Sequence, residues 1–167
     1  MKYVYDDGGR AAAGYKGDAG DCVTRAIAIA LEKPYQEVYD DLNGLRASMR
    51  QTRRVRGSSS RTGVNRRIYD HYLKSHGWVW EPTMSIGSGC KVHLTDGELP
   101  IGRIIVRLSK HLAAVIDGVI HDTHDPQREA HCVEPDHGQP LKASQWRNEN
   151  GICSIQRRCV YGYYRAS

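Results

Sequence analysis

Residues 21–31 read DCVTRAIAIAL, and this stretch decides the fold. Asp21 is a favourable N-cap residue, and the residues after it are apolar nearly all round, which predicts a helix over 22–31. A helix with so little polar surface belongs in the middle of a core. We therefore expect a domain built around a buried helix that opens at Cys22.

Two more helices are predicted in the first half of the chain. Pro34 suits the first turn of the second helix, which should end at Gly44, and the third should end at Gly77. Their apolar residues repeat at the spacing of one helix face. These residues are Tyr35, Val38, Tyr39 and Leu42 in the second helix and Val64, Ile68, Tyr69, Tyr72 and Leu73 in the third.

The second half predicts strands. Residues 101–108 alternate between apolar and charged side chains. Strands over 111–116 and 119–123 should flank the Asp-Gly pair at 117–118, a strong signal for a two-residue hairpin turn. A last strand is expected over 158–164. Helices first and antiparallel strands second indicate an α+β fold, with the N-terminal helices packed on a C-terminal antiparallel sheet.

The size and composition fit one soluble domain. The 167 residues suit a single domain over 1–167, with an irregular segment at 1–20 and an exposed Arg-rich loop at 49–61. The start has no apolar run typical of a signal peptide, and no stretch approaches the roughly 20 apolar residues of a membrane helix. The cysteine count of five is odd, so we expect reduced thiols, a cytoplasmic location and no membrane contact.

Cys22 stands at the predicted first turn of the buried helix. Unpaired amides and the positive end of the helix dipole lower the pKa of a thiol there, and the thiolate is the attacking species. An isolated cysteine in this place would more often be a small packed side chain. A second feature, on the hairpin, favours the nucleophile.

The hairpin register brings a histidine and a carboxylate together. With a two-residue turn, the predicted pairs are Ile116–Val119, Val115–Ile120 and Ala113–Asp122. His111 and Asp122 then share a face as diagonal neighbours, roughly 7 Å apart at the backbone. A one-residue slip would put His121 in place of Asp122. An imidazole oriented by a carboxylate is the base half of a Cys-His-Asp site.

Two stretches resemble the papain-like cysteine peptidases. GDCVTRAIAIALEKPYQEVYDDL is similar to their nucleophile helix and the helix after it, and SKHLAAVIDGVIHDT to their His strand, hairpin and Asp strand. The residue pattern is most similar to that of small phage or bacterial members and of the bacteriocin leader-processing peptidases. The resemblance covers roughly residues 20–125 and implies that Cys22 is the nucleophile, His111 the base and Asp122 the orienting residue.

One position departs from the family pattern. The family usually has a Gln about six residues before the nucleophile, where it donates to the oxyanion, and this chain has Lys16 there. Lys16 and the backbone amide of Cys22 are therefore the oxyanion candidates.

The remaining histidines and cysteines offer a weak zinc pattern. Cys90 and His93 have a Cys-x-x-His spacing. His121 and His124 should point to opposite faces of a strand, and no tight second pair completes the set. Further members would be His131 and Cys132, while Cys153 and Cys159 are expected to be packed thiols. We expect neither a metal nor another cofactor.

Positive charge gathers in one segment. The net charge is +5, and no acid interrupts the chain between Asp41 and Asp70. The candidate anion-binding residues are Arg50, Arg53, Arg54 and Arg56. They could contact an acidic protein or phosphates, although a solvated face is the simpler interpretation. Trp78 and Trp80 alternate as on a strand and either pack or line a substrate groove.

Two functions are predicted. The first is a papain-like cysteine peptidase or related thiol amidohydrolase that cuts an unknown peptide or amide through an acyl-enzyme. The alternative is a catalytically weak or inactive papain-like binding module that uses the Arg-rich segment to hold an acidic protein or nucleic acid. The sequence leaves the substrate and the oligomeric state open.

Overall fold

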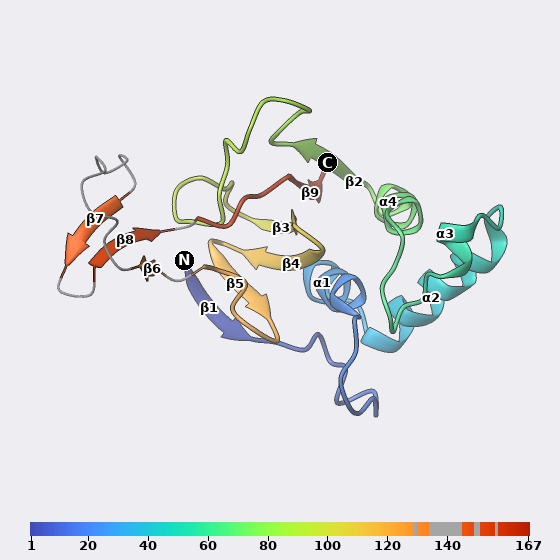
Figure 1. Cartoon of the computed structure of the whole chain (residues 1–167). Helices are drawn as coiled ribbons and strands as arrows, with labels where there is room; N and C mark the ends of the chain where they lie inside the picture. Colours follow the sequence, from blue (N-terminus) through green and yellow to red (C-terminus); the bar gives the residue numbers. More distant parts are fainter. Residues whose placement is uncertain (129, 134–144, 149–150, 156) are drawn as a thin grey trace.

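The computed structural model describes the whole chain except residues 129, 134–144, 149–150 and 156 (Figure 1). It is an α+β fold in which helices lie against a six-stranded sheet. The helices are α1 (Cys22–Leu31), α2 (Tyr35–Ser48), α3 (Arg53–Arg56) and α4 (Arg66–Ser75). The strands are β1 (Lys2–Tyr5), β2 (Trp78–Pro82), β3 (Arg103–Leu108), β4 (His111–Ile116), β5 (Val119–Asp122), β6 (Ala130–Val133), β7 (Gln145–Asn148), β8 (Gly151–Ile155) and β9 (Gly162–Ala166).

The large sheet is mixed, where an antiparallel sheet was predicted. Its strand order is β1-β5-β4-β3-β9-β2, and β1 pairs in parallel with β5 while the other pairs are antiparallel. The expectation of an irregular segment over 1–20 missed β1. This edge strand has only four residues and a mostly exposed pattern, so it carries little hydrophobic signal.

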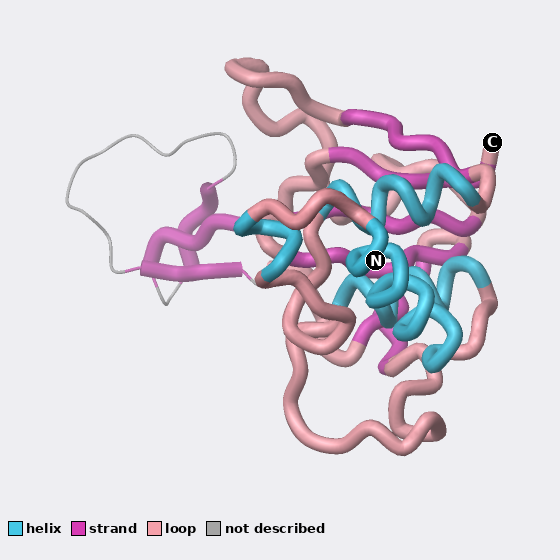
Figure 2. Tube along the Cα trace, turned by 90° about the vertical axis from the view of Figure 1, so that its right-hand side faces the viewer, coloured by secondary structure: helices cyan, strands magenta, loops and turns pink. Residues whose placement is uncertain are grey.

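A second sheet was not predicted. It consists of β6, β8 and β7, in that order, and lies to one side of the larger sheet (Figures 1 and 2). Cys153 on β8 is directly opposite Cys132 on β6.

Both faces of the large sheet bury apolar side chains. Helix α1 packs against β4, and the cluster on this face includes Ile27, Ile105 and Ala114. Ile104 and Val115 belong to a second cluster, on the other face, because successive strand residues point to opposite sides. The predicted burial of α1 is confirmed, since Val23 to Ala30 are all buried.

The Arg-rich segment is packed rather than loose. Val55 on α3 is 1% exposed, and the carbonyl of Ser60 accepts a hydrogen bond from Thr24 on α1 (3.0 Å). Arg46 donates to the carbonyl of Ser58 (2.9 Å). The arginines of 49–61 are exposed, as predicted, but the segment is not all loop, because it contains α3 and buries Val55, Ser58 and Ser60.

Other boundaries also differ. Gly44 lies inside α2 rather than at its end, and the last strand begins at Gly162. Tyr35 and Leu42 of α2 are buried, so tertiary packing outweighs the helix-breaking tendency of one glycine. Among the described helices, none has the length and apolar character needed to cross a membrane.

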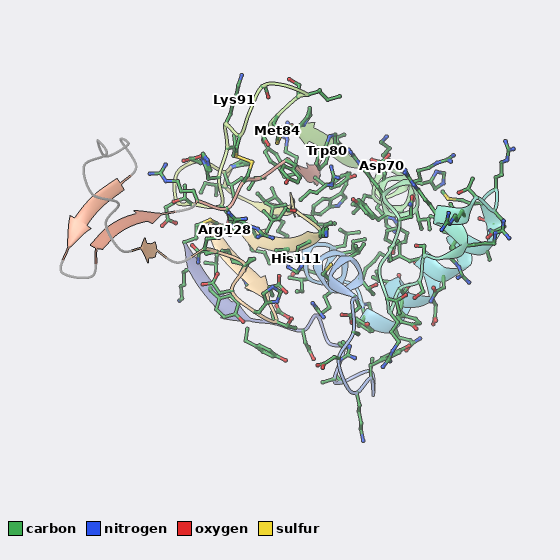
Figure 3. The ribbon with its side chains drawn as sticks, in the orientation of Figure 1. Asp70, Trp80, Met84, Lys91, His111 and Arg128 are labelled. Carbon is green, nitrogen blue, oxygen red and sulfur yellow. A yellow bond between two sulfur atoms is a disulfide. The ribbon has the colours of Figure 1, made fainter. Side chains whose placement is uncertain are left out.

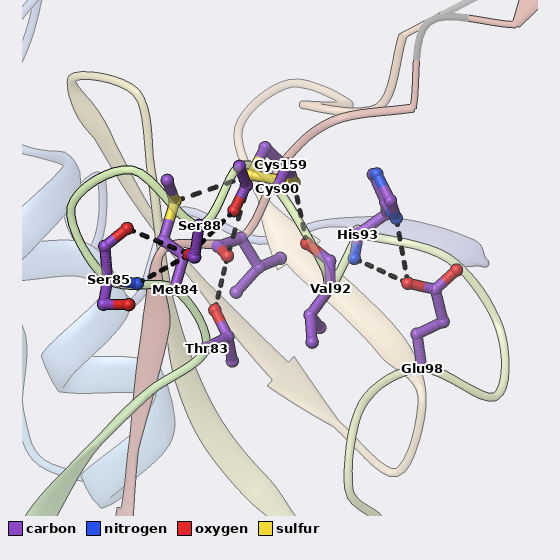
Figure 4. The surroundings of a disulfide bond; sticks show 11 residues. Thr83, Met84, Ser85, Ser88, Cys90, Val92, His93, Glu98 and Cys159 are labelled. Carbon is purple, nitrogen blue, oxygen red and sulfur yellow. Dashed lines mark hydrogen bonds and ion pairs between the residues drawn. A yellow bond between two sulfur atoms is a disulfide. The ribbon is translucent and has the colours of Figure 1, made fainter.

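Cys90 and Cys159 form a disulfide (Figure 4). The prediction of reduced thiols is wrong for this pair. The segments that carry them lie side by side, since Leu94 N donates to the Arg158 carbonyl (2.8 Å) and Val160 N to the Val92 carbonyl (2.9 Å). The pairing joins residues 69 positions apart, a separation at which sequence spacing gives no signal.

Candidate active site

The nucleophile candidate opens α1 as predicted. Cys22 is the first residue of the helix and is half-buried. The amides of the first turn have no carbonyl partner within the helix. Asp21 occupies the N-cap position, but its side chain makes no capping hydrogen bond, so the prediction of a capping role for Asp21 is wrong.

The hairpin has the predicted register. Val115 pairs with Ile120 and Ile116 with Val119, and the ladder continues to Ala114 and His121. Asp117 and Gly118 have φ values of 48° and 78°, as a type I′ turn requires. The register brings His111 Nε2 into a hydrogen bond with Asp122 Oδ2.

His111 contacts both other members of the predicted triad. Its Nε2 binds Asp122, and its ring lies close enough to the Cys22 thiol for each group to shift the pKa of the other. Figure 3 labels His111 beside the start of α1. The structure thus brings Cys22, His111 and Asp122 together from three separate elements.

The thiol and the imidazole shift each other's pKa. Burial alone would raise the pKa of Cys22, but hydrogen bonds from His111 and the Leu112 amide and the charges of His111 and Arg25 lower it overall. Burial alone would lower the pKa of His111, but its bonds to Asp122 and Cys22 raise it to about 9. Each group therefore stabilises the charged form of the other, thiolate for Cys22 and imidazolium for His111.

Asp122 is held by the backbone as well as by His111. The side chain is 3% exposed, and Oδ1 accepts a hydrogen bond from the Thr123 amide (2.7 Å). Arg25 NH2 lies 3.7 Å from the same oxygen. These contacts fix the carboxylate before any substrate arrives.

Sequence reasoning missed a buried charged network behind the triad. Asp21 is fully buried and forms an ion pair with Arg25, one turn further along α1. Arg10 Nε lies 2.9 Å from Asp21 Oδ2, and the Tyr35 hydroxyl donates to the same oxygen (2.6 Å). Burial and this hydrogen bond raise the pKa of Tyr35. The available signal was one arginine inside an otherwise apolar helix.

The neighbours of Asp122 have other roles. His121 Nδ1 binds Asp6 (3.1 Å), and Asp125 Oδ1 accepts from the Gln127 amide (2.9 Å). The ring of His124 packs against that of His111 in a tilted arrangement, with ring centroids 4.9 Å apart. Of these three, only His124 contacts the imidazole of His111, as the predicted pairing required.

An open cleft of about 810 Å³ lies in front of the triad. Its walls include Cys22 and Val23 of α1, the loop 17–20, and residues 107–108 and 110–112. Cys22 and His111 line it directly, while Asp122 lies behind them. A groove between a helix layer and a sheet layer is suited to an extended chain.

Lys16 does not complete the site. Its side chain is exposed, and only its carbonyl is engaged, by Arg10 (3.3 Å) and Arg61 (3.4 Å). It is not among the residues that line the cleft. The backbone amide of Cys22 is the predicted oxyanion donor that the geometry still offers.

The predicted anion-binding arginines divide into two pairs. All four are exposed, but only Arg53 and Arg54 line a second hollow, of about 530 Å³. Arg50 and Arg56 line neither that hollow nor the cleft. Trp78 is buried and Trp80 packs on Tyr164, with ring centroids 4.8 Å apart, so neither forms part of the cleft wall.

The zinc pattern does not assemble among the described residues. Cys90 is bound in the disulfide, and His93 Nδ1 binds Glu98 (3.0 Å). The side chains of His131 and Cys132 lie outside the described ones. The one group with ligand atoms within 4.8 Å of each other, in the part that the structure describes, is His111, Asp122 and His124. Two of these are already paired with each other.

Comparison of the chain with protein-family models, with curated proteins and with solved structures finds no match. The geometry of Cys22, His111 and Asp122 is therefore the basis for inferring a function.

Proposed function

We propose that the protein is a papain-like cysteine peptidase or a related thiol amidohydrolase. The observation that carries the proposal is the position of His111, whose Nε2 binds Asp122 and whose ring is close enough to Cys22 for each group to shift the pKa of the other. Cys22 and His111 line an open cleft, and Asp122 lies behind His111. Nucleophile, base and orienting carboxylate are the parts that acyl transfer requires.

The mechanism follows from the protonation states. The Cys22 thiolate attacks the amide carbon, and the carbonyl oxygen takes up the negative charge. His111 gives its Nδ1 proton to the leaving amine, which leaves a thioester on Cys22. His111 then takes a proton from water, and the hydroxide attacks the thioester. The Cys22 thiolate leaves as the acid departs, which restores the thiolate–imidazolium pair. Asp122 keeps the ring oriented and stabilises its charged form.

A second candidate is a non-catalytic binding module on the same scaffold. It is favoured by one observation, the absence of the Lys16 side chain from the cleft wall. Without a side-chain donor the oxyanion would depend on backbone amides, and loss of one donor costs roughly 10²- to 10³-fold in rate. Such a protein would keep a reactive thiol but turn over slowly.

An activated ester tests both candidates. Mixing the protein with p-nitrophenyl acetate should give a rapid burst of one nitrophenolate per chain, followed by turnover, with the acetyl group on Cys22 by mass spectrometry. Cys22→Ala should abolish the burst, and Asp125→Ala, which leaves Cys22, His111 and Asp122 in place, serves as the control. Burst without turnover would support the binding module. An equal burst from Cys22→Ala would refute a nucleophilic Cys22.

A further inference from the structure

The wall of the active-site cleft is strongly basic. Its cations are Arg10, Arg25, Arg66, Arg107 and Lys110, and its one carboxylate is Asp18. Arg10 and Arg25 both form ion pairs with the buried Asp21. The other three form no ion pair with a carboxylate in the part of the chain that the structure describes.

Two of these cations are held in place by aromatic rings. The guanidinium carbon of Arg66 lies 4.7 Å from the centroid of a Trp80 ring, and that of Arg107 lies 5.7 Å from the centroid of Tyr161. Burial raises the pKa of Tyr69, and the charges of Arg107 and Arg66 oppose this rise, which places both cations near the same hydroxyl. A guanidinium that stacks on a ring still directs N–H groups outward to bind a carboxylate.

The basic wall continues beyond the cleft. Gly63 and Val64 line the cleft and also line the second hollow, so the two spaces adjoin there. Arg53 and Arg54 line that second hollow, and both are exposed. Guanidinium groups therefore border a path that starts at Cys22 and passes over Val64.

We infer that the substrate is an acidic polypeptide, whose Asp or Glu side chains bind Arg66 and Arg107 in the cleft and Arg53 and Arg54 beyond it. The inference rests on the proposed function, because it takes the bond to be cut at Cys22. A polypeptide fits better than a nucleic acid, since the described lining of the second hollow contains no aromatic side chain on which a base could stack. In an acidic polypeptide, uncharged backbone separates the carboxylates from one another. They can therefore pair with arginines that are themselves spaced apart.

Binding can be tested apart from chemistry. The Cys22→Ala protein should bind a fluorescent peptide of alternating Glu and Ala in an anisotropy titration, and the Gln and Ala analogue at least tenfold more weakly. Raising the ionic strength to about 1 M, where the Debye length is about 3 Å, should remove most of the difference. Stronger binding of a single-stranded oligonucleotide than of the Glu peptide would overturn the inference in favour of nucleic acid.

Charge reversal locates the path. Two double variants are made in the Cys22→Ala background. One is Arg66→Glu with Arg107→Glu, in the cleft, and the other is Arg53→Glu with Arg54→Glu, in the second hollow. Each should weaken binding of the Glu peptide roughly tenfold. Arg50→Glu with Arg56→Glu changes the net charge equally at exposed residues outside both hollows and should have little effect. Equal effects from all three pairs would overturn the inference, because only the overall charge would matter. The Arg53 and Arg54 pair lies on the surface, so its result stands if the cleft pair misfolds.

Cleavage separates this inference from the proposed function. With Cys22 present, digestion of a mixed peptide library should favour peptides with Asp or Glu near the cut over their Asn and Gln analogues. Cleavage without this preference would refute the acidic substrate and leave the peptidase intact. Binding of the Glu peptide without an ester burst at Cys22 would refute the peptidase and leave the acidic ligand.

Discussion

Asp122 offers the sharpest test of the triad, because two substitutions separate its charge from its hydrogen bond. Asp122→Ala removes both, whereas Asp122→Asn keeps an oxygen that can accept from His111 Nε2. Arg25 would lose one neighbour in either variant, but it keeps its ion pair with Asp21. We therefore expect both variants to fold.

The expected size of the effect follows from the pKa of His111. A rise from 6.5 to about 9 corresponds to roughly 3 kcal/mol in favour of the imidazolium. If Asp122 supplies half of this, its loss costs about 1.5 kcal/mol, or roughly tenfold in the equilibrium constant for forming the imidazolium. Any acyl-transfer rate should fall further, by orders of magnitude in Asp122→Ala, because the ring also loses its orientation.

The assay is the rate of Cys22 alkylation by iodoacetamide between about pH 5 and about pH 10. A raised imidazole pKa means that the thiolate–imidazolium pair persists below about pH 9 and is lost above it. Removing the Asp122 charge should move this upper limit to lower pH in both variants, with the larger loss of rate in Asp122→Ala. The pH of this upper limit therefore measures how much the charge of Asp122 contributes to the raised pKa of His111.

Asp125→Ala is the matched control, because Asp125 is three residues away and binds Gln127 instead. It should leave the pH profile unchanged. A crippling Asp125→Ala together with a silent Asp122→Ala would refute the hairpin register. An unchanged upper limit in Asp122→Asn would refute the electrostatic explanation for the pKa of His111.

Three further predictions test the surroundings of the site. Arg25→Gln should raise the pKa of Cys22 in the alkylation profile and lower the melting temperature, because it leaves the buried Asp21 charge with one arginine fewer. Cys90→Ser should destabilise the protein by about 4 kcal/mol in a denaturant titration, as expected for a disulfide that joins residues 69 positions apart. The alkylation rate of Cys22 in the folded protein should not change. Lys16→Ala should leave the acylation rate within about twofold, since the side chain is exposed and outside the cleft wall; a hundredfold loss would restore Lys16 as the oxyanion donor.

The central elements were predictable because each carried a local signal. The apolar stretch from Val23 to Ala30 predicts a buried helix whatever surrounds it, and the turn at Asp117-Gly118 fixes the hairpin register by itself. The position of Asp122 beside His111 then follows from strand geometry alone. The site was predictable to the extent that it depends on these two segments.

The parts of the fold that were not predicted depend on contacts between segments distant in the sequence. Strand β1 exists because its residues pair with β5, more than a hundred positions away. The packing of the Arg-rich segment depends on Thr24 and on Val55, whose burial a run of charged neighbours conceals. Gly44 has the character of a helix end, yet buried Leu42 before it and partly buried Leu45 after it pack on the core and keep α2 continuous. Such pairings leave no periodic trace in the sequence.

Asp21 combines a local sequence signal, that of an N-cap, with contacts to distant segments. As an N-cap it would have used its side chain on the first-turn amides and placed a negative charge beside Cys22, which opposes a thiolate. Instead the carboxylate is buried against Arg10, Arg25 and Tyr35. The same Arg25 approaches Asp122, so one cation neutralises the residue before the nucleophile and also lies beside the carboxylate that orients its base. The amides of the first turn are left without a capping side chain, and an oxyanion forming at Cys22 would need such donors.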